Sequence, residues 1–239
     1  MDIVARLAEV RGRIAEAARR ASRDPSSVTL VAVSKFHPTT AIEAAYAAGQ
    51  RHFGENRVQE AEEKKRSLGS LIECADPLRL ELIGALQSNK ARKAVAAVWR
   101  IQSIDSAALG ERVGRIAIEM GRRVPALIQV DLAGEATKSG VPEAALFETL
   151  EALRSAEGLC VEGLMAIPPF LEDPNDVRPY FARLRALRDQ ARERGLLEGA
   201  ELSMGMSHDF EGAIEEGATI VRVGTAIFGA RTAEPGGSA

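Results

Sequence analysis

Lys35 stands where a lysine of a soluble protein is uncommon. It is one of six lysines in the chain, and it directly follows the apolar run Leu30-Val31-Ala32-Val33-Ser34. Such a run predicts a buried strand, with Lys35 at its poorly solvated carboxyl end. Burial disfavours the charged ammonium and favours the neutral amine, which is the form that condenses with a carbonyl compound. The structural alternative is a lysine that snorkels to the rim of a sheet.

A second group of residues could hold an anion. Ser207 follows Met204-Gly205-Met206 and is expected to cap a helix. Gly224 and Thr225 end another strand-like run and open a short helical segment. Glycine lets backbone amides approach an anion closely, and a helix start presents the positive end of its dipole. These residues predict a phosphate site.

The elements that must position these residues alternate between strand-like and helix-like segments. This alternation predicts a single (β/α)₈ TIM barrel, since eight strands with helical crossovers fit its usual size. An open doubly wound sheet is the alternative, but no G-x-G-x-x-G turn follows the first strand. The expected strands are residues 28–34, 51–55, 78–83, 100–104, 126–131, 160–166, 201–204 and 219–223.

The two ends of the chain differ from the repeating part. Residues 1–22 place Ile3, Leu7, Val10 and Ile14 at helical spacing, which predicts an extra amphipathic helix before the first strand and no secretory signal. We expect one domain over residues 1–231 and a disordered tail over residues 232–239.

Composition excludes several classes of function. The 239 residues carry a net charge of −3, without the basic excess of a nucleic-acid-binding protein. Two cysteines are too few for a disulfide framework, and three histidines show no metal-ligand spacing. No apolar stretch reaches transmembrane length. We expect a monomeric cytoplasmic protein that binds neither nucleic acid nor membranes nor a metal.

Barrel closure would bring the two groups of residues together. In such barrels the functional residues lie at the carboxyl ends of the strands, and phosphate often binds after strands 7 and 8. Strand 8 neighbours strand 1, so the phosphate site would lie beside Lys35. A carbonyl compound that carries a phosphate and is held as an imine describes pyridoxal 5′-phosphate (PLP).

Seven sequence blocks carry a resemblance to a known family. The chain resembles the pyridoxal phosphate homeostasis proteins (the YggS/PROSC family), whose single barrel is similar to the N-terminal domain of alanine racemases. The resemblance covers essentially the whole chain. The blocks are LVAVSK (30–35), HFGENRVQE (52–60), IGALQSNK (83–90), LIQVD (127–131), GLMAIPP (163–169), LSMGMSHD (202–209) and VRVGTAIFGAR (221–231).

The resemblance implies roles for individual residues. It places the cofactor imine on Lys35 and an arginine, Arg222, opposite the pyridine nitrogen, where it keeps that nitrogen unprotonated and weakens the ring as an electron sink. Asn56 would contact the ring or its phenolic oxygen. The residues that would hold the phosphate are Ser207, Gly224 and Thr225.

Four positions depart from the family pattern. The family often has Trp-His where this chain has Leu80-Glu81, and His where Gln102 stands before Ser103. It often has Asn where Asp131 ends the fifth expected strand. These departures concern the finer contacts of the barrel rim.

Binding PLP does not by itself imply catalysis. Two-base racemisation needs a second acid–base group opposite the lysine. Alanine racemases take a tyrosine from an additional domain, whereas Tyr46 and Tyr180 fall in expected helices. We therefore expect a carrier that buffers PLP and passes it to apo-enzymes, with no robust catalysis. A weak racemase, with His37 or His208 as the second base in an oligomer, is the first alternative.

Two further alternatives and two further lysines, Lys90 and Lys138, remain. The chain could be a Schiff-base aldolase without cofactor, or an interaction module that uses Lys64-Lys65-Arg66, which is expected to be a solvated helix face. Lys90 is expected to start the helix after the third strand. Lys138 is a hypothetical transient landing site for the aldehyde.

Overall fold

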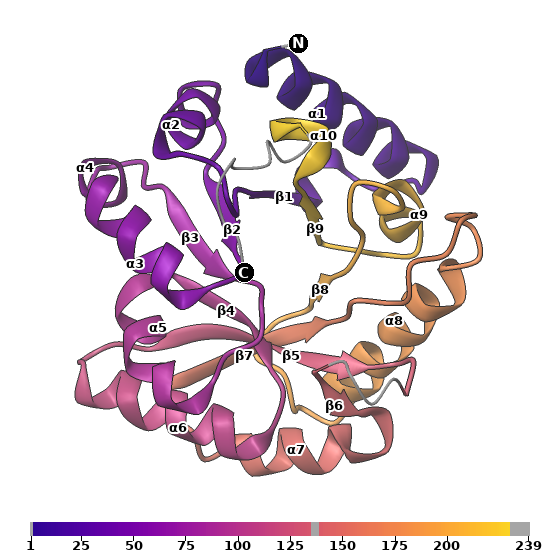
Figure 1. Cartoon of the computed structure of the whole chain (residues 1–239). Helices are drawn as coiled ribbons and strands as arrows, with labels where there is room; N and C mark the ends of the chain where they lie inside the picture. Colours follow the sequence, from indigo (N-terminus) through magenta and orange to yellow (C-terminus); the bar gives the residue numbers. More distant parts are fainter. Residues whose placement is uncertain (1, 135–138, 230–239) are drawn as a thin grey trace, which may run out of the picture.

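The structure is a computed structural model that describes residues 2–134 and 139–229. The expected tail, residues 232–239, and Lys138 lie outside the described residues. Eight parallel strands form one closed sheet in the order β4-β3-β2-β1-β9-β8-β7-β5, and β4 pairs with β5 to complete the ring. Figure 1 shows helices surrounding this ring. The fold is therefore the TIM barrel that the sequence predicts.

Each barrel strand falls within two residues of its expected position. The strands are short, and their buried side chains are the apolar runs of the sequence. They are β1 (Thr29–Val33), β2 (His52–Glu55), β3 (Arg79–Leu82), β4 (Arg100–Ile104), β5 (Val124–Asp131), β7 (Leu159–Met165), β8 (Glu201–Ser203) and β9 (Ile220–Val223). A two-residue strand, β6 (Val141–Pro142), pairs with the end of β5.

All helices of the described residues except the short α4 bury side chains. In α1 the buried residues Leu7, Val10, Ile14 and Ala17 recur at helical spacing, as the sequence predicts. The helices are α1 (Ile3–Arg20), α2 (Thr39–Ala47), α3 (Val58–Ser67), α4 (Gly69–Ile72), α5 (Ala91–Ala97), α6 (Ala107–Glu119), α7 (Leu146–Leu153), α8 (Arg178–Glu193), α9 (Phe210–Glu215) and α10 (Thr225–Phe228). Single 3₁₀ turns span Pro25–Ser27, Ser88–Lys90 and Glu143–Ala145.

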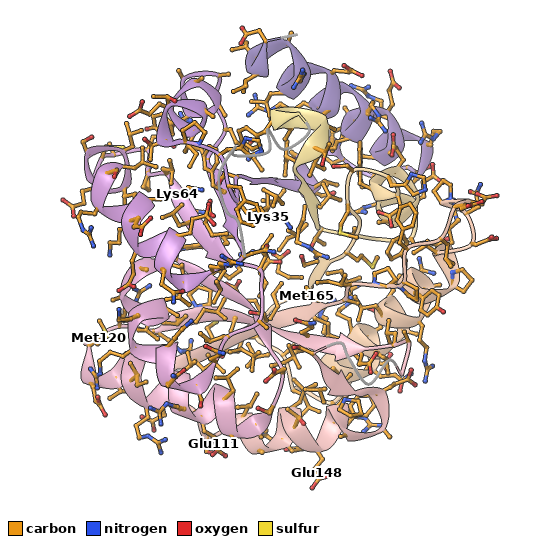
Figure 2. All side chains as sticks on the ribbon, viewed as in Figure 1. Lys35, Lys64, Glu111, Met120, Glu148 and Met165 are labelled. Atoms are coloured by element: carbon orange, nitrogen blue, oxygen red, sulfur yellow. The ribbon has the colours of Figure 1, made fainter. Side chains whose placement is uncertain are left out.

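The inside of the barrel is partly apolar and partly polar. Val31, Leu127, Met165 and Ile220 form a small buried cluster of their own. Figure 2 shows Met165 near the barrel axis, whereas Glu111 and Glu148 point outward from the ring of helices. Other interior positions carry buried polar side chains, including an arginine of β9. This polar region reaches from the carboxyl ends of the strands toward the opposite end of the barrel.

Candidate functional site

A cavity of about 550 Å³ opens at the carboxyl ends of the strands. It is lined by every residue that the sequence predicts for cofactor binding. These residues come from the ends of β1, β2, β8 and β9, which closure of the barrel brings together. They are Lys35, Asn56, Ser207, Arg222, Gly224 and Thr225.

Lys35 lies in a turn two residues beyond the end of β1. Figure 2 shows it inside the ring of strands. Its side chain is half-buried, so water reaches more of it than the sequence predicts. Among the described residues, Nζ has no hydrogen-bond or ion-pair partner. The amine is therefore directed into the cavity without an acceptor that would occupy it.

The turn that carries Lys35 is fixed by its neighbours on both sides. Lys64 Nζ donates to the backbone oxygen of Ser34 at 2.8 Å, and the Ser34 hydroxyl donates to Glu55. On the other side, the Phe36 amide donates to Glu60 Oε1 at 2.6 Å. Phe36 has a φ of 65°, which non-glycine residues rarely adopt. Such backbone strain persists only where surrounding contacts enforce it.

Lys64 is buried, contrary to the expected solvated helix face. Its side chain is 6% exposed and its ammonium lies 2.7 Å from Glu55 Oε1 and 2.9 Å from Glu60 Oε1. The reason is that α3 turns this position toward the sheet. Lys65, one position further, is half-exposed and donates to the backbone oxygen of Ala96.

Glu55 has an unusual electrostatic environment for a carboxyl group. Its side chain is fully buried, and Oε2 has no hydrogen-bond partner among the described residues. Burial raises the pKa of Glu55 to about 7, although the Lys64 charge and the hydrogen bonds from Lys64 and Ser34 oppose that rise. This carboxyl therefore titrates near neutrality, directly beneath the Lys35 turn.

The expected phosphate residues lie on two neighbouring turns. Ser207 lies in the turn after β8, and the helix after it begins only at Phe210, so the expectation that Ser207 caps a helix is wrong. Asp209 precedes that helix and its Oδ1 accepts the Met206 amide at 2.6 Å, which closes the turn. At Gly224, an added Cβ would lie 3.2 Å from Val33. Glycine therefore keeps this turn close to β1.

Arg222 lies in the barrel interior and is 3% exposed. Its Nη1 donates to Ser203 Oγ at 2.6 Å and its Nη2 donates to the Ala166 backbone oxygen at 2.9 Å. Burial lowers the pKa of Arg222 to about 10, against the favourable field of Asp209, so the side chain stays cationic at neutral pH. It presents a fixed positive charge to the cavity.

Asn56 is held at the cavity by the close approach of two loops. A Cβ added at Gly84 would lie 2.8 Å from the Cα of Asn56 and closer still to its backbone oxygen. Only glycine lets the segment after β3 pass that near to the segment after β2.

The four departures from the family pattern have separate environments. Asp131 accepts the amides of Ala133 and Gly134 at 3.0 Å and so fixes the loop after β5. Leu80 is buried in the core outside the barrel. Glu81 and Gln102 lie inside the barrel, where Gln102 Nε2 donates a hydrogen bond to Glu81 Oε2.

Several residues of the cavity were not predicted from the sequence. Gln129 on β5 donates to the backbone oxygen of Ser139, and both line the cavity. Ile167 and Phe170 form part of the rim, and Phe170 is 75% exposed. The position of Gln129 near a strand end was a signal for it. The sequence carries no comparable signal for Phe170, because its exposure depends on how the following segment folds.

Of the residues considered for a second acid–base role, one histidine lies at the cavity and the others lie elsewhere. His208 lines the cavity, its ring is tilted against that of Phe170, and its Nε2 lies 3.1 Å from the Glu172 backbone oxygen. His37 packs against Phe228 instead. Tyr46 and Tyr180 lie on α2 and α8, as expected, and not among the residues lining the cavity. Among those lining residues, the titratable side chains are Lys35, His208 and Arg222.

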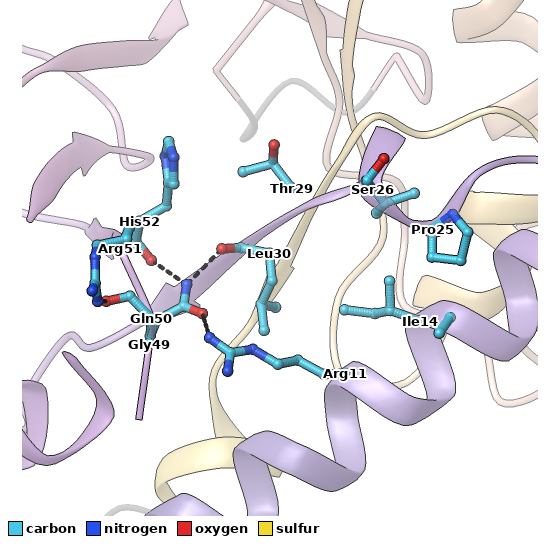
Figure 3. Close-up of a pocket in the computed structure, with 12 residues that line it drawn as sticks. Arg11, Ile14, Pro25, Ser26, Thr29, Leu30, Gly49, Gln50, Arg51 and His52 are labelled. Atoms are coloured by element: carbon cyan, nitrogen blue, oxygen red, sulfur yellow. Dashed lines mark hydrogen bonds between the residues drawn. The ribbon is translucent and has the colours of Figure 1, made fainter. Parts of the chain in front are cut away.

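A cavity of about 520 Å³ lies at the opposite end of the barrel, between α1 and the starts of β1 and β2. Figure 3 shows Gln50 at its centre, donating to the backbone oxygens of Leu30 and His52 and accepting from Arg11. These bonds join α1 to the sheet. None of the predicted cofactor residues reaches this cavity, so we assign it a structural role.

The remaining sequence expectations concern lysines, metals and membranes. Lys90 directly precedes α5, as expected. Within residues 2–134 and 139–229, no group of three or more His, Cys, Asp or Glu side chains is arranged to hold a metal ion. In the same residues, no helix is long and apolar enough to cross a membrane.

Comparison with known proteins identifies full-length relatives. The family model described as the alanine racemase N-terminal domain matches residues 6–232. A pyridoxal phosphate homeostasis protein of Aquifex aeolicus is 42% identical over 231 residues, which cover 97% of this chain and 99% of the relative. A protein of the same name from Pseudomonas aeruginosa is 42% identical, with 96% of each chain covered.

Two solved structures superpose on nearly the whole of this chain. PipY of Synechococcus elongatus, solved with PLP bound, is 44% identical and superposes with a TM-score of 0.83 over 95% of this chain and 100% of its own. Alanine racemase from Corynebacterium glutamicum has a TM-score of 0.72 at 19% identity, over 95% of this chain and 62% of its own. The second likeness is one of fold.

Proposed function

This chain belongs to the pyridoxal phosphate homeostasis proteins, within the alanine racemase N-terminal domain family, and from that premise we propose that it binds PLP as an imine on Lys35 and buffers or carries the cofactor. The observation that carries the proposal is the convergence of all six predicted residues on one cavity. PLP itself supplies an aldehyde, which an amine such as that of Lys35 can hold reversibly.

The residues of the cavity fit this cofactor. Lys35 offers an amine without a competing acceptor among the described residues. Ser207, Gly224 and Thr225 offer two hydroxyls and backbone amides for a phosphate near the start of α10. Arg222 is a donor that stays charged, so it suits an unprotonated pyridine nitrogen. At Gly224 an added Cβ would lie 3.2 Å from Val33, so glycine lets this turn lie close to β1 at the cavity wall.

We further propose that the protein is a carrier without robust catalysis. An arginine opposite the ring nitrogen weakens the electron sink that carbanion chemistry requires. Among the described residues lining the cavity, His208 is the single candidate for a second base besides Lys35, and it is exposed to solvent. An open, wet cavity favours exchange of the aldehyde over sustained proton abstraction. Apo-enzymes would then receive the cofactor from a monomeric cytoplasmic carrier.

The first experiment tests the imine. The purified protein and Lys35→Ala are titrated with PLP while the visible absorbance of the imine is recorded, followed by borohydride reduction and peptide mass mapping. We expect the absorbance and a reduced adduct on Lys35 in the wild type and neither at that position in the variant. An adduct at another lysine, with full absorbance in Lys35→Ala, would overturn the assignment.

The weak-racemase alternative has one structural observation in its favour, the presence of His208 at the cavity. It predicts exchange of the α-proton of L- or D-alanine with deuterium from solvent, abolished in His208→Asn. The carrier proposal predicts exchange no faster than with free PLP, and transfer of PLP from the loaded protein to an apo-enzyme.

A further inference from the structure

A chain of hydrogen bonds crosses the barrel interior from the cavity toward the opposite end. Arg222 Nη1 donates to Ser203 Oγ at 2.6 Å, and the Ser203 hydroxyl donates to Gln102 Oε1 at 2.6 Å. Gln102 Nε2 then donates to Glu81 Oε2 at 2.7 Å. The four side chains are at most 3% exposed. Water therefore does not compete for these bonds.

The two ends of the chain fix the direction of every bond in it. Arginine can only donate hydrogen bonds, and an ionised carboxylate can only accept them. Serine and glutamine can do both, so their orientation follows from the ends. Arg222 forces the Ser203 oxygen to accept, and Glu81 forces the Gln102 amide group to donate. Loss of the charge at Glu81 removes the charged acceptor that aligns the chain from its far end.

Glu81 is also held as a carboxylate by two groups outside this chain of hydrogen bonds. His52 Nδ1 lies 2.6 Å from Oε1, and Arg100 Nη1 lies 3.7 Å from Oε2. Burial alone would raise the pKa of Glu81, but the His52 hydrogen bond, the Arg100 charge and the Gln102 amide together hold it below the ordinary value.

Arg222, at the cavity end, has a full charge and no direct counter-ion. None of the ion pairs of the described residues includes it, and its two hydrogen-bond acceptors, Ser203 and Ala166, are neutral. A buried cation is costly unless negative charge or aligned dipoles face it. The Asp209 carboxylate acts on Arg222 without an ion pair, and the dipoles of Ser203 and Gln102, aligned by Glu81, add to this field through three hydrogen bonds.

We propose that Glu81, Gln102 and Ser203 are positioning residues that orient Arg222 toward the cavity. This proposal rests on the proposed function only for its effect on PLP. It also accounts for two departures from the family pattern, since Glu81 and Gln102 stand where the resembling family often has histidines and contact each other. They form one donor–acceptor pair, so each is adapted to the presence of the other.

The test exchanges the two residues. Glu81→Gln removes the charge, Gln102→Glu places two carboxylates in contact, and the double variant Glu81→Gln/Gln102→Glu restores one carboxylate and one amide. In the double variant, the carboxylate introduced at position 102 can accept from Ser203 and from the amide introduced at position 81. The oxygen of that amide can accept from His52. Glu162→Gln is the matched control, because Glu162 faces the same Arg100 at 3.0 Å but does not contact Gln102.

The first readout uses the protein without PLP. The guanidinium resonances of Arg222 are assigned with Arg222→Lys and followed by nitrogen–proton NMR, including proton exchange with water. We expect Glu81→Gln to shift these resonances and speed exchange, the double variant to return both toward the wild type, and Glu162→Gln to leave them in place. Unchanged Arg222 resonances in a folded Glu81→Gln protein would overturn the proposal.

The second readout is PLP affinity. We expect about tenfold weaker binding in Glu81→Gln and recovery in the double variant, on the scale of one charge-assisted hydrogen bond. Equal affinity in all variants would also overturn the proposal. If the wild type itself binds no PLP, the proposed function fails, whereas the resonances still decide whether Glu81 orients Arg222.

Discussion

The Glu55 carboxyl makes the stability of this protein depend on pH near neutrality. Its pKa is about 7 in the folded protein against an ordinary value of 4.5, so folding favours the protonated form. The resulting stabilisation is fully present below pH 4.5 and is lost as pH rises through about 7. Glu55→Gln lacks this titration. The free energy of unfolding of the wild type relative to Glu55→Gln should therefore fall by at most about 3 kcal/mol between pH 4.5 and about pH 8.

Urea unfolding at several pH values measures this difference. Glu63→Gln is a suitable control, because Glu63 is exposed on the neighbouring helix α3. Parallel curves for the wild type and Glu55→Gln across the whole range would show that burial does not raise the pKa of Glu55.

Single residues were predictable where the sequence around them was distinctive. Lys35 and Arg222 could be placed because each ends or lies in an apolar run, and the run fixes its position on the barrel. Lys64 could not, because charged neighbours at helical spacing look the same on a solvated helix and on one that faces a buried carboxylate. The Glu81–Gln102 pair could not either, since 21 positions separate its members and only barrel closure brings them together.

At the scale of elements, α3 supports the turn that carries Lys35, because Lys64 of α3 donates a hydrogen bond to the backbone oxygen of Ser34. Lys64→Met should lower the free energy of unfolding by about 3–5 kcal/mol, because Glu55 and Glu60 lose their buried cation. It should also weaken PLP binding, since Ser34 loses its donor. Lys65→Met, a partly exposed neighbour, should change the unfolding free energy by less than about 1 kcal/mol. Similar losses in both variants, in urea unfolding and PLP titration, would contradict this role of α3.

The close contact between the segment that follows β2 and the segment that follows β3 allows a second test at the scale of elements. Gly84→Ala places a methyl group against the Asn56 backbone, which cannot move without disturbing the cavity. We expect weaker PLP binding and a loss of about 1–3 kcal/mol in unfolding free energy. Gly12→Ala on α1 should instead raise the unfolding free energy by about 0.5–1 kcal/mol, because an added Cβ at this position meets no atom within 4 Å. Thermal unfolding and PLP titration of both variants compare the two sites.

Element positions were predicted more reliably than element ends. The strands followed from apolar runs bounded by glycine and polar residues, because a strand covered on both faces needs such a run. The start of α9 was misjudged, since Ser207 is a good capping residue in general. In this turn Asp209 Oδ1 accepts a hydrogen bond from the Met206 amide, and Asp209 occupies the N-cap position of α9. This hydrogen bond within the loop outweighed the general preference of serine for the N-cap position.

For the whole molecule, closure of the barrel could be predicted because eight similar units leave few other arrangements. Contacts between distant parts of the surface could not. Arg13 and Arg20 on α1 pair with Glu211 and Glu215 at the other end of the chain. Charges of this kind are common on every helix, so the sequence does not indicate which ones meet. The same helix α1 packs against α10, which follows the Gly224 turn of the site.

The amino-terminal helix should therefore support the phosphate side of the cavity from outside. Figure 1 shows α1 beside α10, and a Cβ added at Gly229, just after α10, would lie 2.7 Å from Arg6. Leu7 is fully buried beneath α1, so Leu7→Ala should lower the unfolding free energy by about 2–5 kcal/mol. It should also speed PLP release, because α1 packs against α10 and Leu7 anchors α1. Val4→Ala, at a position 47% exposed on the same helix, should leave both quantities nearly unchanged. Release kinetics unaffected by Leu7→Ala would mean that α10 holds its position through the barrel alone.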